Sequence, residues 1–234
     1  LVGILCIIMT FSSLDMSQAV PNSASHVGAS GSPVKIEVPP LARTVTLDGH
    51  VTRSDEWSDA SRTDLTLDCR IESCRDAPVE TVEVVVWTKH DDTWLYLLYQ
   101  VKYASYPFGD MSAWIKYCWS RIGRIPWEAC DLGELIFGKG GNDWFGERLS
   151  SLNPPGADFG SLPDHEMGGE NNVVGKATRG GAHHWFEFKK ALNSADGRDW
   201  LLKTGNTYGV EDLDGVMTLS FGGQEGNGDF PRWA

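Results

Sequence analysis

The chain has few basic residues, and this scarcity limits the partners that it can bind. Its 234 residues contain 20 Lys and Arg against 32 Asp and Glu, which gives a formal net charge of −12 at pH 7. An acidic chain repels phosphate backbones, and no cluster of Lys and Arg offsets that repulsion locally. The composition therefore argues against nucleic acid as a partner.

Long hydrophobic runs are also scarce. Only the opening LVGILCIIMTF is apolar over a long stretch; its length is typical of a signal-peptide core and too short to span a bilayer. Ser17-Gln18-Ala19 follows with the small-x-small pattern that signal peptidase accepts. We therefore expect residues 1–19 to be a signal peptide and the mature chain to be secreted or on the cell surface, without a transmembrane segment. The alternative is a buried N-terminal strand or an uncleaved anchor.

The expected leader lacks an initiator Met and a basic residue, since the first Lys or Arg is Lys35, so we expect the natural chain to start further upstream. Residues 20–42 are rich in Ser, Gly, Ala and Pro and predict a flexible N-terminal segment. No linker divides the rest, so residues 43–234 predict a single domain. Removing Asp15 with the leader leaves 31 acids against 20 bases, a net charge of 20 − 31 = −11.

Catalytic sequence motifs are absent. The chain contains no GxSxG, no HExxH and no Cys/His arrangement of the kind that nucleophilic or metal-dependent enzymes use. Asp164, His165 and Glu166 stand together, as an acid/base group would, but acidic loops produce such triples by chance. We expect a protein that is not an enzyme.

Cysteine is uncommon but even in number after the leader. Of five cysteines, Cys6 lies in the leader, and Cys69, Cys74, Cys118 and Cys130 remain. An exported chain with four cysteines predicts two disulfides, and no CxxC knuckle with a matching His indicates zinc. Three pairings are open, and sequence proximity favours Cys69 with Cys74 and Cys118 with Cys130.

Alternating apolar residues predict strands along most of the chain. The clearest unit is a hairpin over residues 81–103 that turns at residues 90–93. Other strands are expected at 35–38, 43–47, 114–118, 134–137, 172–178, 183–189, 207–210 and 216–221, and a long loop rich in Gly and Pro at 138–181. The only helix candidate is residues 54–60. This pattern predicts an all-β, antiparallel β-sandwich with jelly-roll-like connections.

Three stretches resemble family 9 carbohydrate-binding modules and their relatives. Leu47-Asp48-Gly49, then Asp55-Glu56-Trp57 and Ala60, are similar to the opening of that sandwich. Asp92-Thr93-Trp94-Leu95-Tyr96 resembles a later strand, and Phe186-Glu187-Phe188 with Ala191-Leu192 resembles another. The resemblance spans about residues 43–222. It implies a sandwich shared with DOMON domains and with the haem-binding subunit of ethylbenzene-dehydrogenase-type enzymes, so sugar and haem are both implied ligands.

The motif residues also have direct physical interpretations. We expect the Trp57 side chain to be buried in the core, where it covers one end of the sheets, and Asp48 with Gly49 to form a tight turn. Glu187 lies between Phe186 and Phe188 and should therefore face away from both.

Aromatic residues, by contrast, are plentiful. Ten tryptophans exceed what packing of a domain this size requires. Exposed rings stack on the apolar faces of sugars while nearby polar groups bond the hydroxyls. The candidate ligand residues are Trp114, Tyr117, Trp119, Arg124, Trp127 and Trp144. Strand alternation places Trp114 opposite Tyr117 and Trp119, and the alternative for each ring is a place in the core. We expect a non-catalytic binder of a glycan or polysaccharide.

Two acidic loops are candidate calcium sites. One contains Asp196 and Asp199, and the other contains Glu211, Asp212 and Asp214. Carboxylate oxygens suit a hard cation, although Asx turns would order the same loops. Calcium, where bound, would be structural.

Two other functions stay open. Haem would need axial ligands, for which Met111, Met167, His183 and His184 are candidates; the two adjacent histidines would face opposite sides of a strand. A surface structural subunit would self-associate if the N-terminal segment donated a strand to a neighbour.

Overall fold

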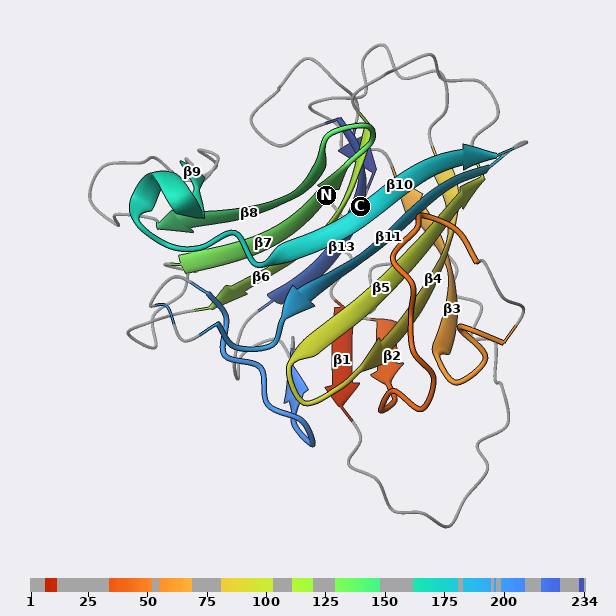
Figure 1. Cartoon of the computed structure of the whole chain (residues 1–234), viewed down its shortest axis with the longest axis horizontal. Helices are drawn as coiled ribbons and strands as arrows, with labels where there is room; N and C mark the ends of the chain where they lie inside the picture. The colour runs from red at the N-terminus through yellow and green to blue at the C-terminus, as the bar shows by residue number, and fades with distance from the viewer. Residues whose placement is uncertain are drawn as a thin grey trace.

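The structure is a computed structural model that describes residues 7–11, 34–51, 55–68, 81–102, 111–119, 129–147, 162–180, 183–194, 196, 199–208, 216–223 and 232–233. Within these ranges the chain forms two β-sheets packed against each other (Figure 1). The described residues contain one short 3-10 helix, η1, at Asp164–Met167. No helix among them is long and apolar enough to cross a membrane. The predicted all-β sandwich is confirmed.

The smaller sheet has five strands in the order β10-β11-β5-β4-β3, all antiparallel to their neighbours. Its strands are β3 (Ser61–Asp68), β4 (Thr81–His90), β5 (Trp94–Lys102), β10 (Val173–Gly180) and β11 (His183–Ala191). β4 and β5 form the predicted hairpin, and β5 lies in the interior of the sheet.

The larger sheet has nine strands, with β12-β1-β13-β6-β7-β8-β9 as its main path. Its strands are β1 (Ile7–Phe11), β2 (Val34–Val38), β6 (Met111–Trp119), β7 (Ala129–Ile136), β8 (Gly140–Glu147), β9 (Leu162–Pro163), β12 (Thr207–Tyr208), β13 (Val216–Gly223) and β14 (Arg232–Trp233). β6, β7 and β8 form an antiparallel meander that faces β11 and β10 of the smaller sheet.

β1 lies within the segment that we expected to be a signal peptide. It pairs in parallel with all five residues of β2 and antiparallel with β12 and β13, and Met9 is buried in the core. This is the buried N-terminal strand that the sequence left open. Cleavage after Ala19 and this pairing exclude each other in one molecule.

The core lies between the sheets because alternate residues of each strand point inward. The smaller sheet contributes Val82, Val84, Val86, Leu95, Leu97, Val101, Phe186 and Phe188, and the larger sheet contributes Ala113, Ile115, Tyr117, Leu135 and Leu219. Tyr99 also crosses the core, and its hydroxyl donates to the backbone oxygen of Trp114 at 2.8 Å. The two layers are therefore joined by a hydrogen bond as well as by apolar packing.

Three local predictions were wrong. Residues 43–47 are not a strand, because side-chain carboxylates rather than a neighbouring strand bind their backbone: Arg43 N donates to Asp59 and Thr46 N to Glu56. Residues 55–59 form turns in place of a helix. The expected loop at 138–181 contains β8, β9 and the whole of β10; β10 matches the strand expected at 172–178, whereas β8 went unrecognised because it is rich in glycine.

The packing explains one glycine of β8. A Cβ at Gly141 would lie 2.4 Å from the backbone oxygen of Val173 on β10, so only glycine lets the two sheets approach this closely.

Candidate functional site

The outer face of the smaller sheet, which points away from the core, carries a row of stacked planar side chains. The rings of Trp87 on β4 and Trp185 on β11 lie with centroids 6.4 Å apart and planes 24° from parallel. The Arg62 guanidinium lies 5.6 Å from the centroid of Trp87, and the His183 ring lies 6.1 Å from that of Trp185. We call Arg62, Trp87, Trp185 and His183 the outer-face row.

Strand register explains how the row forms. Trp87 pairs with Leu98 of β5, while Trp185 pairs with Gln100 two residues further along the same strand. The two indoles therefore meet diagonally across β5, within the reach of large aromatic side chains. Both rings are half-buried, so each keeps an accessible part.

Polar side chains lie near the two indoles, which also pack against the apolar cluster of Trp57, Ala60, Tyr96 and Leu98. Arg62 is exposed and donates to Asp64 Oδ1 at 2.8 Å, and Gln100 is half-buried beside Trp185. Lys102 and Glu83 form an exposed ion pair of 2.9 Å in the next row of the sheet. The outer-face row thus combines accessible rings with hydrogen-bonding groups of both kinds.

The rest of this face is covered by residues 39–51 and 55–60, which we call the N-terminal wrap (Figure 1). Glu187 of β11 holds the wrap, because its carboxylate accepts from Asp48 N and Gly49 N, both at 2.9 Å, and from Trp57 Nε1 at 3.0 Å. Gly49 has φ of 87°, and a Cβ there would lie 2.7 Å from Thr178 Cγ2. The motif residues that carry the family resemblance are therefore structural, and Trp57 covers this outer face rather than an end of the sandwich.

Lys89 of β4 anchors the same wrap. Its buried ammonium donates to Arg43 O at 3.1 Å, Glu56 O at 2.6 Å and Asp59 Oδ1 at 2.8 Å, and it lies 4.9 Å from the Trp57 ring centroid. Since the wrap is fixed by these bonds and by Glu187, the outer-face row lies on the part of this face beside the wrap, where Trp87 and Trp185 pack against the cluster that contains Trp57.

Burial raises the pKa of Glu187 to about 7, against the opposing effect of its three hydrogen-bond donors. The negative charge of Glu56 adds to the increase.

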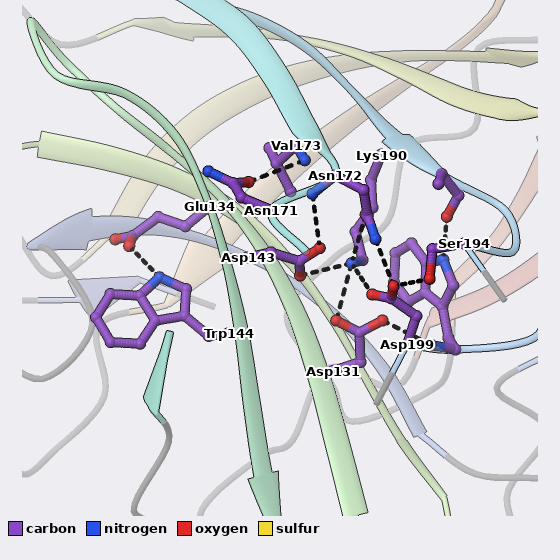
Figure 2. A network of polar contacts seen from close by, with 12 residues as sticks. Asp131, Glu134, Asp143, Trp144, Asn171, Asn172, Val173, Lys190, Ser194 and Asp199 are labelled. Carbon is purple, nitrogen blue, oxygen red and sulfur yellow. Dashed lines mark hydrogen bonds and ion pairs between the residues drawn. The ribbon is translucent and has the colours of Figure 1, made fainter. Parts of the chain in front are cut away.

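A second polar group lies between the sheets. Lys190 of β11 points inward, and its Nζ lies 2.9 Å from Asp131 on β7, 2.6 Å from Asp143 on β8 and 3.0 Å from Asp199 (Figure 2). All four side chains are fully buried. Asn172 Oδ1 also accepts from Lys190 at 3.2 Å. We call this group the Lys190 network.

The Lys190 network holds its lysine charged. Burial lowers the pKa of Lys190, but the carboxylates of Asp131, Asp143 and Asp199 outweigh that effect and raise it overall. Burial raises the pKa of Asp131 and of Asp143, and Lys190 opposes both increases. The network thereby links β7 and β8 to β11 and to the segment that follows it.

A third acidic group adjoins this network, and we call it the Asp164 cluster. Carboxylate oxygens of Asp164, Asp196 and Asp199 all lie within 4.8 Å of one another. Asp164 is fully buried, and neither of its carboxylate oxygens has a hydrogen-bond partner in the part of the chain that the structure describes. Burial, followed by the charges of Asp143 and Asp199, raises the pKa of Asp164 to about 7.

The predicted ligand residues do not come together in the described ranges. Trp114 and Tyr117 are only 3% and 6% exposed, and as expected they face opposite sides of β6, with Tyr117 in the core. Trp144 is half-buried and donates from Nε1 to Glu134 at 2.9 Å. Only the backbone of Trp119 is described, and Arg124 and Trp127 lie outside the described residues. Trp114 and Tyr117 keep little surface for stacking on a ligand.

The predicted metal, disulfide and haem residues are described in part. Asp196 and Asp199 lie together, as noted above, and Cα of Cys118 pairs directly with that of Cys130. Met111 and His184 are buried, while His183 faces outward. Glu211, Asp212, Asp214, Cys69 and Cys74 lie outside the described residues, as does the side chain of Met167.

Sequence reasoning missed the outer-face row, although a signal for it was present. Trp87 alternates with Val84 and Val86, and Trp185 alternates with Phe186 and Phe188, so both indoles had to face away from the apolar core. Their proximity depends on the pairing of β4 and β11 with β5, which the sequence does not specify.

No protein-family model matches this chain, and no curated protein is significantly similar to it.

Proposed function

We propose that this protein is an exported, non-catalytic glycan-binding module whose ligand stacks on the outer-face row. The observation that carries the proposal is the stacked, half-buried pair of Trp87 and Trp185 on the outer face of the smaller sheet. Half-exposed indoles present apolar surface to the CH faces of a sugar, and burial of that surface contributes favourably to binding.

The surroundings of the pair suit a carbohydrate. Rings at a centroid distance of 6.4 Å are too close to admit a sugar between them, so the ligand would lie across the pair as on a platform. Arg62 covers part of Trp87 but is exposed, so a ligand displaces it at little cost. Once displaced, Arg62 can donate to hydroxyl groups together with Gln100, and Asp64 can accept from them.

Two features support a binding role without catalysis. Lys190 is held charged by three carboxylates and is sealed from solvent. The outer-face row contains one imidazole, His183, whose ring contacts that of Trp185 and has no described carboxylate at hydrogen-bonding distance to orient it. This arrangement favours recognition over acid/base chemistry.

Glycan-array screening followed by calorimetry with the best ligand tests this function. Trp87→Ala and Trp185→Ala should each weaken binding about tenfold or more, equivalent to ~1.4 kcal/mol. Trp94→Ala is the matched control, because Trp94 is also half-buried on this face but lies beside Lys189, away from the row. Equal losses in all three variants, or an array without any ligand, would contradict the proposal.

Haem binding is the alternative that one observation favours. Met111 and His184 are both buried, and Phe137 contacts each of them: its backbone N–H donates to Met111 O at 2.8 Å, and its ring lies 6.3 Å from that of His184. A Met and a His at one end of the core are suitable axial ligands. A Soret band that is lost in Met111→Leu would support haem, and its absence after incubation with haem would remove this alternative.

Export is supported by cysteine chemistry. Cys118 and Cys130 pair in register across β6 and β7, and Cys130 is disulfide-bonded. We propose a Cys118–Cys130 disulfide, which an oxidising compartment would preserve. Peptide mapping by mass spectrometry without a reductant should recover the two residues in one cross-linked fragment.

A further inference from the structure

The Asp164 cluster contains a buried group that the protein alone does not satisfy. Buried polar side chains almost always have hydrogen-bond partners, and an unpaired buried carboxylate is strongly unfavourable. Asp164 is fully buried, yet both of its carboxylate oxygens lack a partner in the described ranges. One of those oxygens lies within 4.8 Å of a carboxylate oxygen from Asp196 and of one from Asp199. The carboxylate of Asp164 therefore lies unpaired beside the carboxylates of Asp196 and Asp199.

The charge balance around Asp164 points the same way. In their ionised forms Asp131, Asp143, Asp164, Asp196 and Asp199 would carry five negative charges, and among the described residues of this region Lys190 supplies one positive charge against them, a formal balance of 1 − 5 = −4. Lys190 contacts Asp131, Asp143 and Asp199, and both carboxylate oxygens of Asp164 stay without a hydrogen-bond partner in the described ranges. A second positive charge would remove repulsion that the lysine leaves in place.

Protonation of Asp164 does not provide the missing partner. A neutral carboxyl group still needs an acceptor for its O–H and a donor for its C=O, and the described residues offer neither to Asp164. A bound cation, in contrast, would contact the oxygens of all three aspartates at once and would neutralise their mutual repulsion.

We propose that Asp164, Asp196 and Asp199 bind a calcium ion beside the Lys190 network. Calcium takes six to eight oxygen ligands in flexible geometry, whereas magnesium demands a near-ideal octahedron. Three carboxylates would supply part of that set. Ser194 now donates to Asp199, and its hydroxyl can rotate to present its oxygen; water would complete the shell.

The placement of the three aspartates suits entry and release of an ion. Asp196 is half-buried, so the cluster reaches solvent at this residue while Asp164 and Asp199 are sealed. Asp164 comes from η1 and Asp199 directly precedes buried Trp200, so a bound ion would connect η1 to the segment that follows β11. Calcium would thereby stabilise the end of the sandwich that holds Lys190, which makes this inference independent of glycan binding.

The test compares the full chain with Asp164→Asn and Asp196→Asn after treatment with EDTA, followed by titration with calcium chloride. In the parent protein, calcium should raise Tm and produce a saturable heat in calorimetry. Both variants should bind calcium about tenfold or more weakly, because each removes a charged ligand. Asp164→Asn should also have a higher Tm than the parent in EDTA, because it removes an uncompensated buried charge.

Asp92→Asn is the control, since Asp92 is an exposed residue in the turn of the β4–β5 hairpin; it should respond to calcium as the parent does. Terbium luminescence excited through tryptophan gives a second measurement that does not depend on stability, with Trp200 adjoining Asp199 in the chain. Failure of 5 mM calcium, about fivefold above the roughly 1 mM Kd of the weakest extracellular sites, to change Tm or give heat would overturn the proposal. An equal calcium response in the parent and both variants would also overturn it.

Discussion

At the scale of single residues, Lys190 has the largest structural role. Its ammonium is fully buried and binds carboxylates from β7, from β8 and from the segment after β11. Trp200 lies against the same ammonium at 5.0 Å and donates its backbone N–H to Asp131 at 2.7 Å. Removing the lysine would leave buried carboxylates uncompensated, and this is more costly than the loss of one favourable contact.

Lys190→Met should therefore lower the free energy of unfolding by about 3–5 kcal/mol. Lys35→Met is the control, because Lys35 is exposed and its ion pair with Glu37 is worth at most about 1 kcal/mol. Urea denaturation measures both variants. Similar stabilities for the two would show that Lys190 is not needed for folding.

Gly133 makes room for the aliphatic stem of Lys190. A Cβ at this position would lie 2.8 Å from Lys190 Cδ, and the stem cannot move aside because its ammonium is fixed by three carboxylates. We expect Gly133→Ala to destabilise the protein by about 1–3 kcal/mol, as overpacking does. Gly180→Ala, where a Cβ meets nothing within 4 Å, should be close to neutral in the same thermal denaturation experiment.

The sequence indicates that Lys190 points inward, but it does not identify the residues that Lys190 contacts. Phe186, Phe188 and Lys190 alternate along β11, so the lysine had to share the face of two core residues. Its partners come from segments 47 and 59 residues earlier and 9 residues later, calculated as 190 − 143, 190 − 131 and 199 − 190. Only the packing of the two sheets brings them together, and no local pattern encodes that packing.

At the scale of elements, the N-terminal wrap is a segment without regular structure that is nevertheless tightly held. Its backbone donors bind side-chain carboxylates: Asp59 accepts from Ala42 and Arg43, and Glu187 accepts from Asp48 and Gly49. Alternating residues predicted a strand at 43–47. The prediction failed because a side-chain carboxylate can accept from a backbone N–H as well as a neighbouring strand can.

Glu187 should give the wrap a pH-dependent stability. Its folded pKa of about 7 exceeds the ordinary value of 4.5, so between these values the folded protein holds a proton that the unfolded chain has released. The stabilisation from that proton is complete below pH 4.5 and is lost as pH rises toward 7. Stability of the parent should thus decline across this window, and part of the decline should be missing in Glu187→Gln.

Glu187→Gln should also be less stable than the parent at pH 8 by about 1–3 kcal/mol, because an amide N–H replaces an oxygen that faces hydrogen-bond donors. Denaturation of both proteins at pH 4.5, 6, 7 and 8 measures the two effects. Parallel stability curves for the parent and the variant would rule out a titration of Glu187 in this range.

Strand prediction succeeded best where apolar residues are dense. β4, β5, β6 and β11 are rich in them, and each was predicted. β3 was missed although Leu65 and Leu67 alternate with polar residues along it. The sequence of β8 is GGNDWFGE, and its inward positions hold Gly141, Asp143 and Phe145. Glycine and aspartate are typical of loops, so this strand was not recognised. Their inward positions are explained by the close approach of β10 to Gly141 and by the bond from Lys190 to Asp143.

At the scale of the whole molecule, the larger sheet depends on a strand from the start of the chain. β1 pairs with β2 over five residues and also contacts β12 and β13. If residues 1–19 are removed, the edges of these strands lose their partner, and an unpaired edge favours pairing with another chain. If the protein self-associates by strand exchange, we therefore expect the donated strand to occupy the position of β1, beside β2, β12 and β13.

A chain that begins at Val20 should be less stable than the full chain by at least about 1 kcal/mol, which corresponds to a decrease in Tm of roughly 2–4 °C. A synthetic peptide with the sequence of residues 5–13 should restore the loss by occupying the position of β1. Differential scanning calorimetry measures both effects. Equal Tm values for the two chains would show that β1 contributes nothing to the sheet.

The two faces of the smaller sheet have different roles: the inner face packs in the core, and the outer face carries the proposed binding residues. Its inner face contributes to the core and the Lys190 network, while the wrap covers part of its outer face. The outer-face row lies beside the wrap on that face. Overall architecture followed from composition and alternation, whereas the row depends on strand order in the sheet, which local sequence does not encode.

The most direct test of glycan recognition is a two-dimensional ¹H–¹⁵N NMR titration of the indole N–H signals with the glycan selected on the array. We predict progressive, saturable shifts of the signals from Trp87 and Trp185, and unchanged signals from Trp57 and Trp200, which are buried and donate to Glu187 and Ala191. Shifts confined to other tryptophans, with those of the stacked pair unmoved at saturation, would contradict the account.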